Sequence, residues 1–269
     1  MSSPIQKRRI ESELHIFEMF RSCNTKGILF ATDKKPEDCP EFAAFAAAFG
    51  GDMKLWMDTS GKADKTPDLF SLEYETMIEL MRVDDHAFVN ENGKVINHAA
   101  SADSKRFKEL VDRGFLETYP NASIIITGDT GLPTLEDHNY QRYKANFERV
   151  VKDHISKIPT YRNNHPECKY LIFLIFDESC GYFEAETVPK EFKKGMMCRG
   201  RPHLWPLDEN LVNVFSGSDV DCVIWFTPYK YAESRFFPEG LPIVSVFFKS
   251  EGRWRIIRYD ESHMVPAEE

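Results

Sequence analysis

Hydrophobic residues recur at a helical spacing in several segments of the chain. In residues 5–22, Ile10, Leu14 and Phe17 follow a period of about 3.6 residues, which predicts an amphipathic helix. The clustered phenylalanines after Pro40 predict a second, short helix that ends at Gly50. Further helices are predicted over residues 103–115, 134–158 and 208–215.

The clearest helical pattern covers residues 134–158. Tyr143 and Phe147 belong to a long apolar stripe along this segment. Thr134 stands at a capping position before the stripe, and Pro159 follows its last residue. We therefore expect one helix that begins after Thr134 and ends before Pro159.

Short apolar runs bounded by polar residues predict strands over residues 27–32, 122–127, 170–176, 220–227 and 241–249. Residues 87–96 resemble a hairpin, and 253–259 are expected to pair with 241–249. Residues 71–83 fit either a helical face or a nearly continuous buried strand. Strands that are apolar throughout are typical of a sheet covered on both faces. We expect an α/β fold with a mixed central sheet, helices on both faces and antiparallel strands toward the C-terminus.

Composition narrows the class of protein. With 269 residues, 42% of them hydrophobic and 13% aromatic, the chain can bury a substantial core, which excludes a largely disordered protein. We expect a single domain over 1–269 with an N-terminal helical extension over about 1–24. Its apolar runs are too short to cross a membrane, and its six cysteines form no CxxC pair. These features predict a cytoplasmic protein with reduced cysteines.

The net charge of −9 argues against a protein that coats nucleic acid, but it leaves a nuclease with local basic patches open. The chain contains no Walker loop, GxGxxG fingerprint or GxSxG elbow. These absences argue against a P-loop NTPase, a standard dinucleotide enzyme and a serine hydrolase.

Acidic residues follow several of the predicted strands. They are Asp33, Asp84-Asp85, Asp129 and Asp177-Glu178. If these strands are parallel neighbours, their carboxylates converge at one edge of the sheet, where a divalent cation would offset their repulsion. The alternative is that these residues form turns and helix caps, which aspartate does frequently.

A second pattern concerns Asp68 and Glu79. Asp68 follows Thr66-Pro67, and after a gap of ten residues Glu79 lies inside an apolar run. Two carboxylates on neighbouring strands of a hairpin could hold Mg²⁺. Over about 20 of the 269 residues, this layout resembles the PD-(D/E)XK signature of the restriction-endonuclease-like superfamily. The resemblance implies a nuclease that depends on Mg²⁺ or Mn²⁺, with Asp68 and Glu79 as metal ligands.

The chain departs from this signature at the lysine position, which holds Met81. In a strand, Arg82 would point to the opposite face, so Lys65 is the candidate that could replace the lysine. Asp84 is a candidate third metal ligand. His86 is a candidate general base, because its pKa range suits proton transfer near neutral pH. Its alternative is a hydrogen-bonded structural histidine.

Basic residues gather in the segment that precedes Trp205. Lys193, Lys194, Arg199 and Arg201 are candidates for binding a nucleic-acid backbone. The alternative is a solvent-facing loop without a ligand.

The sequence thus predicts a metal-dependent phosphodiesterase, most specifically a nuclease acting on DNA or RNA. Three alternatives stay open: a non-enzymatic interaction or regulatory module with a protein partner, an inactive relative of the nucleases, and an enzyme acting on a nucleotide or sugar phosphate. A homodimer is compatible with each.

Overall fold

The computed structural model describes residues 12–23, 27–61, 66–119, 129–188, 199–228, 230, 242–251 and 256–267. Its contacts divide the chain into two compact units. The larger unit comprises Met1–Val83, Phe147–Glu178 and Leu204–Arg258, and the smaller unit comprises Asp84–Asn146, Ser179–His203 and Tyr259–Glu269. Each unit therefore combines segments that are distant in the sequence. None of the helices in the described ranges is long and apolar enough to cross a membrane.

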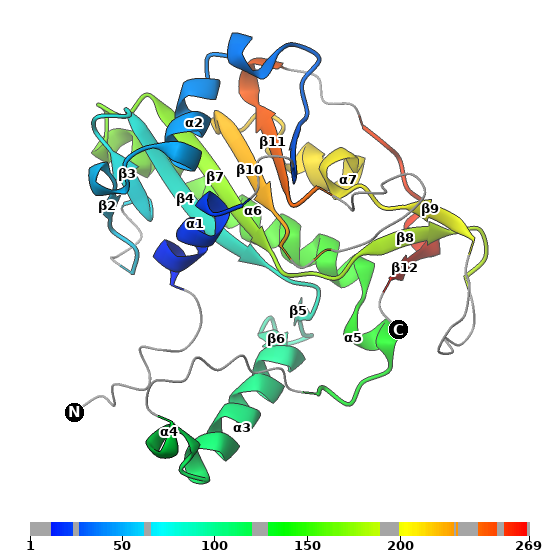
Figure 1. Ribbon diagram of the computed structural model, residues 1–269. Coiled ribbons are helices and arrows are strands. Elements are labelled where there is room, and N and C mark those ends of the chain that lie inside the picture. The colour runs from blue at the N-terminus through cyan, green and yellow to red at the C-terminus, as the bar shows by residue number, and fades with distance from the viewer. Residues whose placement is uncertain are drawn as a thin grey trace. The chain divides into compact units, whose positions relative to one another are not determined.

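A seven-stranded mixed sheet forms the centre of the larger unit (Figure 1). In spatial order its strands are β1 (Ile28–Phe30), β11 (Val244–Phe248), β10 (Cys222–Phe226), β7 (Tyr170–Asp177), β4 (Thr76–Val83), β3 (Leu69–Ser71) and β2 (Met57–Asp58). β4, β7 and β10 are parallel to one another, whereas β3 and β11 run antiparallel to their neighbours β4 and β10. The predicted mixed α/β architecture is confirmed.

Helices α1 (Glu13–Arg21) and α2 (Phe42–Gly50) cover one face of this sheet (Figure 1). Phe17 and Phe20 of α1 are fully buried in the same core as Ile78 and Ile172 of the sheet. Each such side chain stabilises the fold by about 1.5–3 kcal/mol when it leaves water. The apolar stripe predicted in the first helix is therefore the surface that attaches α1 to the sheet.

The opposite face packs against α6 (Tyr140–Asn164), in its part from Phe147 onward. The ring of Phe147 stacks on Trp225 of β10, with the two ring centroids 4.7 Å apart. The expected end of this helix at Pro159 is wrong, because α6 continues through Pro159 to Asn164. A proline costs an interior helix about 3 kcal/mol. The burial of Tyr161 beyond it, at 1% exposure, offsets that cost.

The start of α6 also differs from the prediction. Thr134 begins a separate short helix, α5 (Thr134–Asp137). Asn139 stands just before α6, where its side-chain oxygen accepts a hydrogen bond from the Arg142 N–H at 3.1 Å. Asn139 is thus the residue that caps the long helix.

The ambiguous segment 71–83 forms strand β4 and the turn before it. β4 pairs with β3 on one side and with β7 on the other, and seven of its eight residues are buried. The turn contains no glycine or asparagine; Glu75 itself takes the left-handed conformation, with φ of 48°. Two-sided pairing thus favours the strand over the equally periodic helix.

The smaller unit is built from short elements. A hairpin of β5 (Ala87–Val89) and β6 (Val95–Asn97) confirms the one predicted over 87–96. Strands β12 (Met264–Pro266), β8 (Tyr182–Ala185) and β9 (Gly200–Pro202) form an antiparallel sheet. Helices α3 (His98–Asp112) and α4 (Phe115–Thr118) follow β6. The strand predicted over 122–127 lies outside the described residues.

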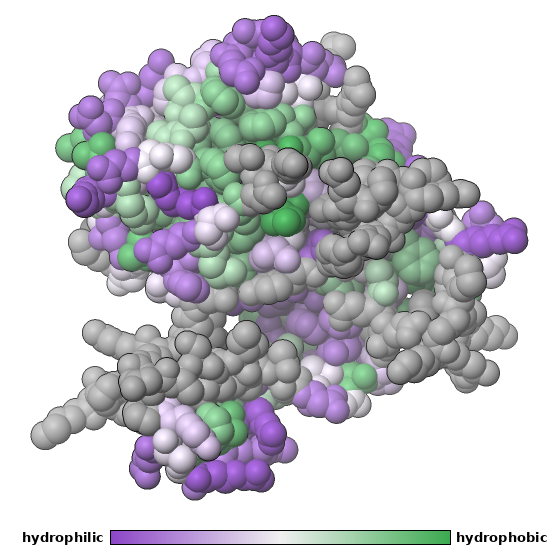
Figure 2. Space-filling model, in the orientation of Figure 1, coloured by the Kyte–Doolittle hydropathy of each residue, from purple (hydrophilic) through white to green (hydrophobic). Residues whose placement is uncertain are grey.

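The last two predicted elements of the larger unit need correction. Helix α7 (Glu209–Val212) is shorter than expected and continues as a 3-10 turn to Phe215. Within the described part of segment 253–259, Ile257 bridges to Asp208 rather than to β11. The Ile257 N–H donates to the Leu207 carbonyl, and the Ile257 carbonyl accepts from the Glu209 N–H. Both backbone groups of Ile257 are therefore already paired and cannot pair with β11. Figure 2 shows hydrophilic side chains on much of this unit's visible surface, bordering more hydrophobic ones.

Candidate functional sites

The β3–β4 hairpin brings Asp68 and Glu79 together. Leu69 of β3 pairs with Ile78 of β4, so the register carried one residue further places Asp68 opposite Glu79. Residues opposite each other on antiparallel strands point to the same face of the sheet, with their Cβ atoms about 5 Å apart. Because Leu69 and Ile78 face the core beneath α1 and α2, the two carboxylates face the α6 side.

Glu79 is a buried carboxylate held by helix α6. Only 4% of the residue is exposed. Its Oε1 lies 2.6 Å from His154 Nδ1 and accepts a hydrogen bond from the Tyr161 hydroxyl at 2.8 Å. Its Oε2 is buried and has no hydrogen-bond partner among the described residues. One oxygen is therefore fixed by the protein, while the other retains its full capacity to accept a proton or a cation.

Asp68 is the more exposed member of the pair. Burial, and then the negative charge of Glu79, raise the pKa of Asp68 to about 7. The Leu80 N–H opposes this by donating to Oδ2 at 2.8 Å, and His154 also lowers the pKa slightly. Glu13 of α1 acts with Glu79 to raise it. The ionised form of Asp68 is thus disfavoured unless a positive charge lies beside it.

The other residues considered for this metal site are not shown to join Asp68 and Glu79. Met81, at the lysine position of the motif, is buried. Arg82 makes a bidentate ion pair with Glu178 and is therefore already engaged. Lys65 lies outside the described residues. Asp84 accepts hydrogen bonds through Oδ1 from the backbone of the following turn.

Asp84 is thus a turn residue, which was the alternative to metal binding for the acids that follow strands. Its Oδ2 accepts a hydrogen bond from Asn97 Nδ2 at 2.8 Å, so both of its oxygens are occupied. Asp129 behaves similarly, since its Oδ1 accepts from the Gly131 N–H. Asp177 is fully buried and pairs with Lys230 Nζ at 2.9 Å.

Only part of the predicted convergence of acids at one sheet edge is possible. β4 and β7 are parallel neighbours and end at the same edge. β1 is parallel to β11, which is antiparallel to β10, so β1 points the opposite way and Asp33 follows it at the other edge. The acids were predicted to converge on the assumption that the strands before them are all parallel, but these strands run in two directions.

His86 belongs to a different cluster, in the smaller unit. There it lies close to Asp85, Asp137 and His138. The sequence singled out His86, but it gave no reason to join it to His138, which lies 52 residues further along the chain. The sequence also missed His154 of the larger unit. A signal existed there, because His154 is a polar residue three positions after buried Val151 in an otherwise apolar stripe.

The basic segment is described only at its end. Lys193 and Lys194 lie outside the described residues. Arg199 is exposed, whereas Arg201 forms an ion pair with Glu184 on the neighbouring strand and stacks over the Tyr259 ring. Arg201 therefore contributes to the β8–β9 sheet, and of the described pair Arg199 is the more available for a phosphate.

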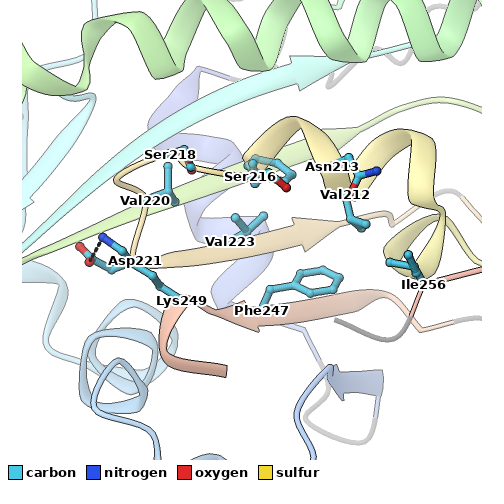
Figure 3. Close-up of a pocket in the computed structure, with 12 residues that line it drawn as sticks. Val212, Asn213, Ser216, Ser218, Val220, Asp221, Val223, Phe247, Lys249 and Ile256 are labelled. Atoms are coloured by element: carbon cyan, nitrogen blue, oxygen red, sulfur yellow. Dashed lines mark ion pairs between the residues drawn. The ribbon is translucent and has the colours of Figure 1, made fainter. Parts of the chain in front are cut away.

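A pocket of about 420 Å³ opens in the larger unit beside α7, β10 and β11 (Figure 3). Phe215, Val223 and Phe247 give it an apolar lining, and Asp221 and Lys249 lie together at one end, paired at 3.9 Å. Neither carboxylate of the Asp68–Glu79 pair lines it. Comparison with protein-family models, with curated proteins and with solved structures gives no match.

Proposed function

We propose that the protein is a phosphodiesterase that depends on Mg²⁺ or Mn²⁺, and specifically a nuclease that hydrolyses DNA or RNA. The observation that carries this proposal is the opposition of Asp68 and Glu79 across the β3–β4 hairpin. The pair has the residue types and the neighbouring-strand arrangement that the resemblance to PD-(D/E)XK nucleases implies. The two acids are metal ligands in this proposal.

The side chains fit a hard divalent cation. Both are oxygen donors, and Mg²⁺ binds through one or two carboxylates while it keeps several waters. Glu79 offers a buried oxygen without a hydrogen-bond partner in the described structure. The carboxyl of Asp68 has a pKa of about 7, so a cation beside it would favour its ionised form near neutral pH. When bound, the metal would activate water and stabilise charge on the phosphate.

Helix α6 supplies the positioning groups. The Tyr161 hydroxyl and His154 Nδ1 both hold the same oxygen of Glu79, which fixes the rotation of the carboxylate and leaves the other oxygen unshared. A carboxylate fixed in this way loses little freedom when it binds a ligand. His154 and Tyr161 thus orient Glu79 without contacting the substrate.

The remaining groups of the proposal follow from the sequence. Lys65 is assigned to the phosphate or the attacking water, in place of the lysine that Met81 replaces. Lys193, Lys194 and Arg199 are assigned to the nucleic-acid backbone. The proposed compartment is the cytoplasm, as the cysteine pattern of the sequence predicts.

The direct test is hydrolysis of labelled single-stranded and double-stranded DNA and RNA with Mg²⁺ or Mn²⁺. Glu79→Gln should lower the rate at least 100-fold, because it removes the charge that holds the cation. Glu73→Gln is the matched control, since Glu73 is an exposed acid of the same hairpin. Equal cleavage by wild type and Glu79→Gln would identify the activity as a contaminant and refute the proposal.

One observation favours a second function. Met81 is buried and apolar where an active nuclease would carry a cation. A protein of this kind could bind nucleic acid, a protein partner or a second copy of itself without cleaving anything. Metal binding at Asp68 and Glu79 with no hydrolysis of any of the four substrates would favour this inactive binding module.

A further inference from the structure

A compact cluster of metal-ligand side chains lies wholly within the smaller unit. Asp85 Oδ2 lies 3.0 Å from His138 Nδ1, and Asp85 Oδ1 lies 3.7 Å from His86 Nε2. The two imidazole rings are 4.8 Å apart between centroids. One ligand atom from each of the three residues can therefore be chosen so that all lie within 4.8 Å of one another.

Asp137 stands on the other side of both imidazoles. Its Oδ1 lies 3.2 Å from His86 Nδ1, and its Oδ2 lies 3.9 Å from His138 Nε2. Each ring thus directs one nitrogen toward Asp85 and the other toward Asp137. In protein metal centres, a histidine ligand typically donates its second N–H to a carboxylate, which fixes its tautomer and orientation.

Asp85 has an oxygen that these neighbours leave unsatisfied. The residue is fully buried, and its Oδ2 accepts hydrogen bonds from the Tyr182 hydroxyl at 2.6 Å and from the Cys180 N–H. Oδ1 is buried without a hydrogen-bond partner in the described structure, and it is the oxygen nearest His86. A buried carboxylate oxygen left this way is costly unless it has a ligand.

We propose that Asp85, His86 and His138 bind one divalent transition-metal ion of the Zn²⁺ class, with Asp137 orienting the two histidines. Metal–ligand bonds of about 2.0–2.1 Å in a tetrahedral site place neighbouring ligand atoms about 3.3 Å apart. The two observed separations, 3.0 and 3.7 Å, bracket this value. They involve the two different oxygens of Asp85, and ligand atoms chosen one per residue lie within 4.8 Å of one another, so binding an ion requires these side chains to draw closer together.

The donor set distinguishes this site from the Asp68–Glu79 pair. Two imidazoles and one carboxylate suit Zn²⁺, Fe²⁺ or Mn²⁺, whereas Mg²⁺ prefers oxygen alone. Three protein ligands leave a coordination position for water or a substrate group. The side chains of His86 and His138 are 18% and 15% exposed, so an ion can enter from solvent.

The test uses the full-length, metal-free protein, with Zn²⁺ measured by titration calorimetry and Co²⁺ by its visible absorption. Wild type should bind one Zn²⁺ per chain at this site. His86→Ala and His138→Ala should each weaken Zn²⁺ binding at least 100-fold, and Asp137→Asn should weaken it about 10–100-fold. His15→Ala is the control, because His15 is an exposed histidine of the larger unit and should leave the affinity unchanged.

Two results would overturn the site. One is wild-type protein that shows no saturable binding of Zn²⁺ or Co²⁺. The other is a His86→Ala or His138→Ala protein that keeps wild-type affinity together with its normal circular dichroism. The Asp85 carboxylate is left intact because it accepts hydrogen bonds from the Tyr182 hydroxyl and the Cys180 N–H, which its replacement would remove. Asp68→Asn should not change Zn²⁺ binding, so this inference and the proposed nuclease site can fail separately.

Discussion

Replacing Asp68 with asparagine should stabilise the metal-free protein at alkaline pH. Raising the pKa of Asp68 from 3.8 to about 7 means that the ionised form costs the folded state about 4 kcal/mol, at 1.36 kcal/mol per pKa unit. Asparagine has nearly the same shape, keeps an oxygen for the Leu80 N–H and carries no charge to repel Glu79. Because Asp68 retains some solvent contact, we treat 4 kcal/mol as an upper limit and expect a gain of about 2–4 kcal/mol.

The gain should depend on pH in a defined direction. Between about pH 4 and 7 the folded state holds a proton on Asp68 that the unfolded chain has lost, so this group's contribution to stability falls as pH rises through that window. The variant lacks this group, whereas Glu79, His154 and Glu13 are present in both proteins. Urea unfolding in EDTA at pH 5, 6, 7 and 8 should show the variant's advantage growing with pH. A constant difference across this range would refute the assigned pKa and the repulsion that explains it.

Two further predictions concern the framework of the fold. Asp177→Asn should destabilise the larger unit by about 3–5 kcal/mol, because it leaves the buried ammonium of Lys230 without its charged partner. In urea unfolding, the double variant Asp177→Asn/Lys230→Met should recover much of this loss. A single variant as stable as wild type would show that the ion pair is not buried as described. Gly200→Ala should lower the melting temperature and disrupt β8–β9 pairing, since its Cβ would lie 2.1 Å from the Glu184 carbonyl oxygen; an unchanged melting temperature would contradict this close approach.

Local patterns predicted β1, β7, β10 and β11, because each of these strands is a short apolar run that needs no distant information. The Asp68–Glu79 pair could also be anticipated, since a hairpin register depends on only a dozen consecutive residues. Pro159 misled the prediction for the opposite reason. The burial that keeps α6 helical beyond it comes from Tyr161 packing against a sheet formed elsewhere in the chain.

The partners of the candidate residues could not be predicted in the same way. His154 contacts Glu79 across 75 positions, and His138 contacts Asp85 across 53. Their approach depends on how helices and loops pack, which periodicity does not encode. Acidic residues that follow strands also cannot be told apart by sequence alone. Asp84 accepts a hydrogen bond from a nearby backbone N–H and is a turn residue, whereas Asp85 has a buried oxygen without a hydrogen-bond partner and is a candidate ligand.

The most direct test of the central claim is the melting temperature of the metal-free protein at pH 8 as Mg²⁺ is added. If Asp68 and Glu79 bind the ion together, wild type should gain about 2.7 kcal/mol of stability when Mg²⁺ reaches 100 times its Kd, and Glu79→Gln should gain almost nothing. An unchanged wild-type melting temperature at millimolar Mg²⁺, or an equal rise in wild type and Glu79→Gln, would contradict the claim.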